Sequence, residues 1–168
     1  MKLNQQFGQL ASSDRIDKVV TALAKNGIKA MVVENGEAAK QKILELIPAG
    51  AEVMNMSSQT LETISVAQEI NESGRYDSAR NKLKAMDEKT QAKEKQQLGA
   101  APEWVIGSVH AVTEDGTVLV ASATGSQLPA YAYGSRQVIW LVGSQKLVKD
   151  FEEGMRRLHE YTFPLEDE

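Results

Sequence analysis

Glu52-Val-Met-Asn-Met-Ser-Ser-Gln-Thr60 is the stretch of sequence that decides the fold. Residues 52–56 form a short apolar run that predicts a β-strand, and the run passes directly into a polar loop at residues 57–60. A helix is predicted after this loop, with Leu61 and Ile64 facing inward. A strand that ends in a polar loop and a helix is the repeating unit of α/β proteins with parallel sheets.

The residues before this stretch repeat the alternation of helices and strands. One helix is predicted by apolar residues at helical spacing, with Ser12 or Ser13 as its N-cap and Asn26-Gly27 at its end. Residues 29–33 predict a strand, and a second helix ends at Pro48. This order predicts parallel strands joined by right-handed crossovers. The apolar helix positions are Ile16, Val19, Val20, Leu23 and Ala24, followed by Ala39, Ile43, Leu46 and Ile47.

The middle of the chain, residues 67–102, is polar, mixed in charge and favourable to helix, without a strand pattern. Because its charges alternate in sign, we interpret it as a solvated helical face rather than a nucleic-acid-binding patch. The chain has 168 residues, of which 42% are apolar, as expected for one globular domain. We therefore predict a single domain over residues 1–168, with residues 67–102 as a helical excursion within it.

Strand patterns return after Pro102. Residues 103–112 and 117–122 predict a β-hairpin, because Asp115-Gly116 supplies the positive φ of a tight turn. A short helix is predicted at residues 128–133, followed by an almost wholly apolar strand at residues 137–142 that we expect at the centre of the sheet. A last helix turns Val148, Phe151, Met155 and Leu158 to one side.

Composition restricts the classes of partner and cofactor. The formal net charge of −4 gives no electrostatic reason to expect nucleic acid or an anionic membrane surface as a partner. The sequence contains no cysteine, which excludes disulfides, thiolate zinc sites and cysteine-ligated iron–sulfur clusters within it. No apolar run approaches the ~20 residues that span a bilayer. We expect a cytoplasmic protein, with no cofactor and no metal of its own.

Several motifs together resemble the LUD-domain family, which includes the C subunit of bacterial lactate-utilisation complexes. The resemblance covers residues 50–165. It is carried by Gly-Ser-Val-His-Ala-Val-Thr-Glu-Asp-Gly at residues 107–116, Ala-Thr-Gly-Ser-Gln at 123–127, Tyr133-Gly134, Val-Ile-Trp-Leu-Val-Gly at 138–143 and Gln-Lys-Leu-Val at 145–148. It implies a fold like that of glucosamine-phosphate deaminase, ribose-phosphate isomerase and the CoA transferases. The expected architecture is therefore α/β: a Rossmann-like, mainly parallel sheet flanked by helices, with a β-hairpin and a helical excursion.

Methylthioribose-phosphate isomerases are a more distant comparison. In those enzymes a Gly-Ala-Asp stretch carries a catalytic aspartate and precedes a Gly-Thr phosphate loop. The corresponding stretch here is Gly107-Ser-Val109, with valine in place of the aspartate, whereas Thr124-Gly-Ser126 keeps the loop. This comparison implies anion binding and identifies no catalytic residue.

Two polar loops are the candidate binding sites. Thr124, Gly125, Ser126 and Gln127 stand before a predicted helix, where backbone amides bind phosphate or carboxylate groups, although Ser126 as a simple helix cap explains part of the pattern. Asn55, Ser57, Ser58 and Thr60 stand at the end of a predicted parallel strand, with capping by Ser57 or Ser58 as the alternative. We expect the two loops to converge on one crevice, with Lys146 at its rim.

Other polar residues have simpler explanations. Glu114 and Asp115 are interpreted as part of a turn rather than as an acid–base pair. His110 and His159 lack the spacing of metal ligands, and Arg156-Arg157 are expected to be solvated.

Two functional hypotheses follow. The first is an accessory subunit linked to L-lactate utilisation, with an iron–sulfur protein as its partner, as the resemblance implies. The second is a stand-alone enzyme or a binding module for a small phosphorylated or carboxylated metabolite. Catalytic residues and activity as an enzyme stay open, and so does a homo-oligomer. A small anionic metabolite is the expected ligand in both hypotheses.

Overall fold

The computed structural model describes residues 3–166, which divide into two compact units. Unit 1 contains the described residues up to Val32, then Val109–Ala121 and the described residues from Val142 onward. Unit 2 contains Val33–Ser108 and Ser122–Leu141. The single domain expected over the whole chain stays a prediction. None of the helices within residues 3–166 has the length and apolar content to cross a bilayer.

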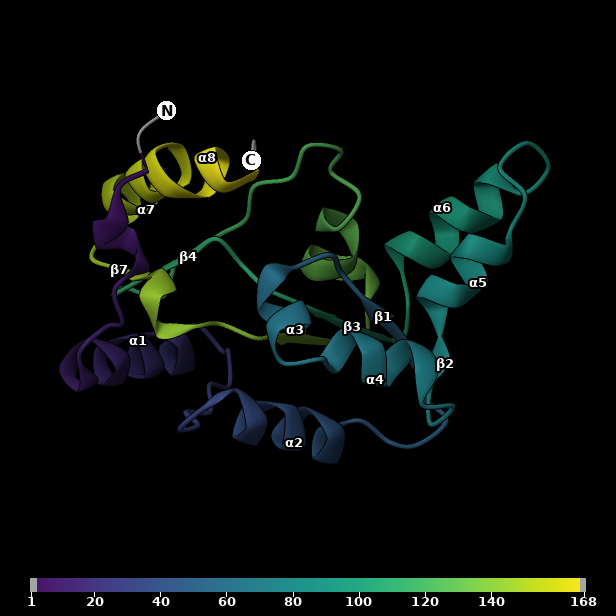
Figure 1. Cartoon of the computed structure of the whole chain (residues 1–168), viewed down its shortest axis with the longest axis horizontal. Helices are drawn as coiled ribbons and strands as arrows, with labels where there is room; N and C mark the ends of the chain where they lie inside the picture. The colour runs from purple at the N-terminus through teal and green to yellow at the C-terminus, as the bar shows by residue number, and fades with distance from the viewer. Residues whose placement is uncertain (1–2, 167–168) are drawn as a thin grey trace. The chain divides into compact units, whose positions relative to one another are not determined.

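Unit 2 is built on a four-stranded sheet in the order β2-β1-β3-β6, and every neighbouring pair of strands is parallel. This arrangement, with helices flanking the sheet, confirms the predicted α/β, Rossmann-like fold (Figure 1). The strands are β1 (Glu52–Asn55), β2 (Asp77–Ser78), β3 (Trp104–Gly107) and β6 (Gln137–Trp140).

Two helices of unit 2 begin at a capping side chain. The side chain of Asn35 accepts a hydrogen bond from the backbone N–H of Ala38 at the start of α2, and Ser78 caps α5 through the N–H of Asn81. The helices are α2 (Gly36–Leu46), α3 (Gln59–Thr63), α4 (Val66–Glu72), α5 (Ala79–Ala85) and α6 (Ala92–Ala100), with a π-helical segment η2 (Ala130–Gly134) before β6.

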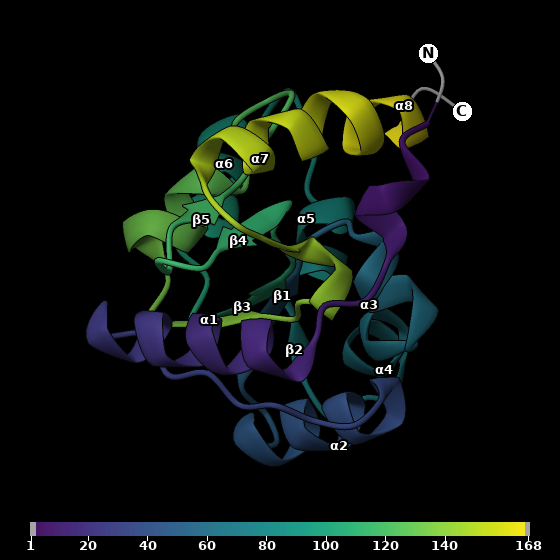
Figure 2. The ribbon, with the colours of Figure 1, turned by 90° about the vertical axis from the view of Figure 1, so that its left-hand side faces the viewer.

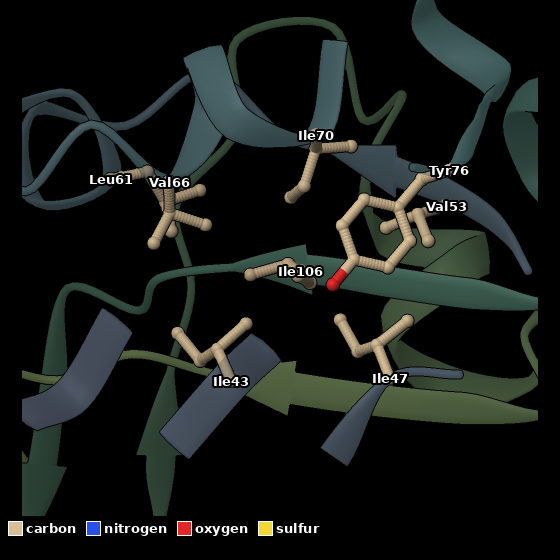
Figure 3. Close-up of a cluster of buried hydrophobic side chains, with 8 residues drawn as sticks. All are labelled: Ile43, Ile47, Val53, Leu61, Val66, Ile70, Tyr76 and Ile106. Carbon is tan, nitrogen blue, oxygen red and sulfur yellow. The ribbon is translucent and has the colours of Figure 1, made fainter. Parts of the chain in front are cut away.

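The core of unit 2 lies between the sheet and the helices α2, α3 and α4. Figure 3 shows its side chains pointing toward one another. Val53 and Ile106 come from adjacent strands, and both are completely buried. The other members are Ile43, Ile47, Leu61, Val66, Ile70 and Tyr76. Three of the four apolar positions that predicted the second helix, Ala39, Ile43 and Ile47, are buried, whereas Leu46 is 36% exposed.

In unit 1, a three-stranded sheet in the order β5-β4-β7 lies between α1 (Ser13–Lys25) and α7 (Phe151–Arg157), as Figure 2 shows. The predicted hairpin is confirmed, because β4 and β5 are antiparallel. Gly116 in its turn has a φ of +84°, and a Cβ there would lie 2.7 Å from the Nδ2 of Asn26. The other elements are η1 (Gln5–Gly8), β4 (Ala111–Thr113), β5 (Val118–Leu119), η3 (Ser144–Lys146), β7 (Leu147–Val148), η4 (Leu158–Thr162) and α8 (Phe163–Glu166).

Three predicted strand assignments need correction. Residues 29–33 do not form a strand; Val32 and Val33 are 63% and 39% exposed, and the boundary between the two units falls between them. The run 103–112 is two strands in different sheets, interrupted at residues 108–110. The excursion at residues 67–102 does contain a strand, β2. A β-branched run forms a strand only where a neighbouring strand is available to pair with it.

The strand predicted at the centre of the sheet is instead at its edge. β6 ends at Trp140 and pairs with β3 alone among the described strands. Both faces of β6 are nevertheless covered. Ile139 packs against the core of unit 2. On the other face, the ring of Trp140 meets that of Tyr131 edge-on, with centroids 5.7 Å apart. Packing on both faces of β6 therefore explains its apolar composition, and a second neighbouring strand is not needed.

Replacement of Leu61 tests this core. Leu61 is completely buried among the clustered side chains, so Leu61→Ala should destabilise unit 2 by about 2–5 kcal/mol, measured as the free energy of unfolding in urea. Leu10, which is 77% exposed, supplies the matched control, and Leu10→Ala should change stability by less than about 0.5 kcal/mol. Equal losses in the two variants would contradict the packing described here.

Candidate functional site

The carboxyl end of β1 presents a buried polar side chain. Asn55, the last residue of β1, is only 2% exposed and lies on the same side of the strand as the core residue Val53. Within the described residues, the Oδ1 atom of Asn55 has no hydrogen-bond partner. A buried acceptor without a donor is destabilising by about 1–3 kcal/mol. The carboxyl ends of strands in open α/β sheets are also where ligands bind.

Arg80 brings a positive charge to this strand end. Its Nη1 donates to the backbone oxygen of Asn55 at 3.1 Å, and its Nη2 donates to the Oγ of Ser57 at 3.1 Å. Within residues 3–166, these recorded partners are neutral oxygens. The helix that carries Arg80, α5, is fixed against β1 because Lys82 forms an ion pair with Glu52 at 2.8 Å and another with Asp77. The guanidinium is therefore held where β1 ends.

Arg80 was not among the candidate residues, because it lies in the stretch interpreted as a solvated helical face. A local signal does exist in the sequence. Ser78 is a strong N-cap residue, so Arg80 falls in the first turn of α5. A cation is unfavourable there, because the N-terminal end of a helix carries partial positive charge. An arginine at such a position indicates that another interaction holds it.

The three hydroxyl residues after β1 differ in their surroundings. Ser57 is exposed and accepts the hydrogen bond from Arg80. Ser58 precedes α3, but its side chain makes no capping hydrogen bond, so helix capping does not account for it. Thr60 is half-buried within α3. Of the four residues predicted at this strand end, the structure joins Asn55 and Ser57 through Arg80.

The second predicted loop is folded by its own hydrogen bonds. The backbone N–H of Gly125 donates to the Oγ of Ser122 at 3.0 Å, and that of Ser126 donates to the Oγ1 of Thr124 at 3.3 Å. The hydroxyl of Thr124 also donates to Ser126 at 2.9 Å. Gly125 has a φ of +72°, and a Cβ there would meet open space. The carbonyl oxygen of Gln127 accepts from the N–H of Tyr131. Anion binding by this loop stays a prediction.

Lys146 belongs to unit 1, whereas both loops belong to unit 2. A crevice shared by the two loops, with Lys146 at its rim, therefore stays a prediction. Within unit 1, Lys146 is the last residue of η3 and is half-buried. Burial, and then the charge of Arg157, lower the pKa of Lys146 to about 8.

Arg157 corrects one expectation of the sequence analysis. Arg156 is exposed and pairs with Glu160 at 3.0 Å, as a solvated arginine does, but Arg157 is only 3% exposed. Its Nε donates to the carbonyl oxygen of Gln145 at 3.4 Å, and its Nη1 donates to the carbonyl oxygen of His110 and, at 3.1 Å, to the Oγ1 of Thr162. Arg157 therefore ties together three separate segments of unit 1.

His110 is the third basic side chain of this part of unit 1, and Arg157 donates to its backbone oxygen. Its Nδ1 accepts a hydrogen bond from the backbone N–H of Ala121 at 3.2 Å, which places the ring proton on Nε2. Burial, and then the charges of Lys146 and Arg157, lower the pKa of His110 below its ordinary value. The structure therefore assembles three basic side chains that were assigned separately from the sequence, one of them to solvent.

The hairpin turn accounts for Glu114 and Asp115, which point to different partners. Glu114 forms an ion pair with Arg15 at 2.8 Å, while the carboxylate of Asp115 accepts from the Thr113 hydroxyl and, at 3.1 Å, from the N–H of Thr117. These two residues border an open hollow of about 770 Å³ along α1, whose charged lining residues are of both signs: Asp14, Asp17, Lys18, Lys25, Glu114 and Asp115.

The coupling between His110 and Lys146 can be measured directly. Lys146→Met removes a neighbouring positive charge, so the pKa of His110 should rise toward its ordinary value, by only part of the total shift because burial is the larger cause. The imidazole C–H resonances, followed by NMR against pH, report this change. Lys149→Met, at an exposed lysine of the same segment, is the control and should leave the pKa of His110 unchanged. An equal response in both variants would contradict the proximity of Lys146 and His110.

Comparison with known proteins gives one result. The family model described as the LUD domain matches residues 16–166, which span both units. Searches of curated proteins and of solved structures return no match to the chain. Since the matched region is nearly the whole sequence, the chain belongs to the LUD domain family.

Proposed function

We propose that this LUD-domain protein is an accessory subunit of an L-lactate utilisation system and that it binds a small 2-hydroxy carboxylate at the carboxyl end of β1. The observation that carries the proposal is the buried Oδ1 of Asn55, which lacks a hydrogen-bond donor within the described residues. Arg80 donates a hydrogen bond to the backbone oxygen of the same residue. Membership of the LUD family supports the link to lactate.

A 2-hydroxy carboxylate has a hydroxyl that can donate a hydrogen bond to Asn55 and a carboxylate that can pair with Arg80. Its hydroxyl donates a hydrogen bond to the Oδ1 of Asn55 and relieves the unsatisfied acceptor. Its carboxylate pairs with the guanidinium of Arg80, whose hydrogen bonds to Asn55 and Ser57 use neutral oxygens. The Oγ of Ser57 then becomes a further donor for the same carboxylate. A ligand without the hydroxyl satisfies only half of this arrangement.

The accessory role follows from the electron balance of lactate oxidation. Conversion of a hydroxyl carbon to a carbonyl removes two electrons, and the side chains of Asn55, Arg80 and Ser57 accept none. Iron–sulfur clusters require thiolate ligands, and this sequence supplies no cysteine. The electrons must therefore pass to another carrier, and the family resemblance favours an iron–sulfur partner protein for that role. Large exposed apolar side chains in each unit, such as Phe151 at 61% and Tyr133 at 96%, support contact with a partner.

Calorimetric titration of the protein with L-lactate tests the binding site. We expect Arg80→Gln to weaken binding of L-lactate by about 10- to 100-fold, because it removes a charge-assisted hydrogen bond worth about 1.5–3 kcal/mol. Asn55→Ala should lower the affinity for L-lactate to that for propionate, which has the carboxylate but no hydroxyl, and should leave the affinity for propionate unchanged.

The matched control for charge is Arg136→Gln. Arg136 is exposed and precedes β6, at the opposite end of the parallel sheet from the proposed site, so its loss should not change binding. If wild-type protein binds L-lactate and propionate equally, or if Arg80→Gln and Arg136→Gln behave alike, the assignment of the ligand to this strand end is wrong.

Electron transfer requires a separate test of the accessory role. The isolated protein should show no absorption from an iron–sulfur cluster and should not reduce a dye electron acceptor when L-lactate is added. Oxidation should begin only when a cluster-containing partner is supplied. Lactate-dependent dye reduction by the isolated protein would favour the stand-alone enzyme over the accessory subunit, whatever the outcome of the binding titrations.

A further inference from the structure

We infer that a small cavity in unit 1 is a binding site for a zwitterionic ligand, of the class of small α-amino acids. The cavity has a volume of about 130 Å³ and lies between residues 6–11 and the segment that runs from η3 to α7. Every residue that lines it belongs to unit 1, whereas Asn55, Ser57 and Arg80 belong to unit 2. The inference therefore stands independently of the proposed function.

The N-terminal wall of the cavity is held by residues from the other end of unit 1. The backbone N–H of Asn4 donates to the carbonyl oxygen of Glu160 at 3.0 Å, and its Nδ2 donates to the carboxylate of Glu160 at 2.7 Å. Phe7 is only 6% exposed, and the guanidinium of Arg156 lies 5.9 Å from the centre of its ring. Figure 2 shows this segment, in purple, passing η3 on its way to α1. Hydrogen bonds and packing therefore fix this wall of the cavity.

Charged groups of opposite sign border the cavity. Arg15 and Lys18 share the carboxylate of Glu114, at 2.8 Å and 3.5 Å, so these three groups keep a net positive charge. Glu153 is half-buried, and its Oε2 accepts a hydrogen bond from the backbone N–H of Lys149. Among the ion pairs of residues 3–166, none includes Glu153. Arg15 and Glu153 thus line the same cavity without pairing with each other.

The other lining groups suit a small molecule with polar and apolar parts. Gln6, Gln9 and Gln145 bring side-chain amides, which both donate and accept hydrogen bonds. Phe7 and Val148 are buried and give the cavity an apolar surface. Since a water molecule occupies about 30 Å³ in the liquid, the cavity has room for about four waters or for one solute of that size.

An α-amino acid has a group for each of these features. Its carboxylate pairs with the guanidinium of Arg15, whose Nε donates to Glu114 and whose Nη groups make no hydrogen bond within residues 3–166. Its ammonium pairs with Glu153, and a short side chain lies against Phe7 and Val148. A simple carboxylate leaves Glu153 unmatched, and a simple amine leaves Arg15 unmatched. A zwitterion satisfies both charges within this small volume.

Calorimetric titration with L-alanine tests the site. In Arg80→Gln, where the carboxylate site at the end of β1 is weakened, L-alanine should bind saturably and with the same affinity as in the wild-type protein. Propionate and ethylamine each lack one of its two charged groups, so both should bind at least about tenfold more weakly to this variant. The inference is overturned if L-alanine does not bind, if it binds no better than propionate, or if Arg80→Gln abolishes its binding.

Substitution of Glu153 then identifies the contact with the ammonium group. Glu153→Gln should weaken L-alanine binding by about tenfold or more and leave propionate binding unchanged, because propionate has no ammonium group. Glu152→Gln is the matched control: Glu152 is exposed and lies in the same first turn of α7, so the same charge is lost from the same helix end. It should change L-alanine binding by less than about twofold. Equal effects of the two substitutions would show a response to net charge alone and would contradict the site.

Discussion

The parallel pairing of β1 with β3 is the constraint on which unit 2 depends. It sets Val53 opposite Trp104 and Asn55 opposite Ile106, and the N–H of Met56 extends the pairing by donating to the carbonyl oxygen of Ile106 at 2.8 Å. Because side chains alternate along a strand, this register places Val53 in the core and Asn55 on the same face, where the strand ends. A shift of one residue would turn both side chains to the other face and bring Met54 into the core. The same pairing that builds the core thus holds a polar side chain at its border.

Sequence periodicity predicted the features of the fold that depend on local chemistry. Helix α1 begins at the predicted N-cap Ser12 and buries Val19, α2 buries the predicted Ala39 and Ile43, and the Asp115-Gly116 turn forms the expected hairpin. The strand at residues 29–33 and the central position of residues 137–142 were wrong for a common reason. An apolar run forms a strand, and a central one, only if other strands pair with it. These partners are far away in sequence and cannot be predicted from the residues of the run itself.

In the candidate site too, the sequence predicted the residues that show a local pattern and not those that depend on distant contacts. Asn55 and Ser57 were predicted as site residues because a polar residue at the end of an apolar strand is a local pattern. Arg80 and Arg157 were missed, although both are buried at least in part, because an arginine on a polar helix gives no local indication of what its guanidinium will contact. The closest indication was the position of Arg80 in the first turn of α5, where the helix dipole disfavours a cation. Long-range hydrogen bonds to backbone carbonyls become visible only when the segments have been assembled.

The central claim is that the buried Oδ1 of Asn55 accepts a hydrogen bond from the hydroxyl of a ligand. A crystal structure of the protein grown with L-lactate tests it most directly. The account predicts the lactate hydroxyl within about 2.7–2.8 Å of the Oδ1 of Asn55, with the carboxylate against the guanidinium of Arg80. If the structure instead shows lactate bound elsewhere, or shows Asn55 hydrogen-bonded to water while Arg80 keeps its contacts with the backbone of Asn55 and with Ser57, the claim is contradicted.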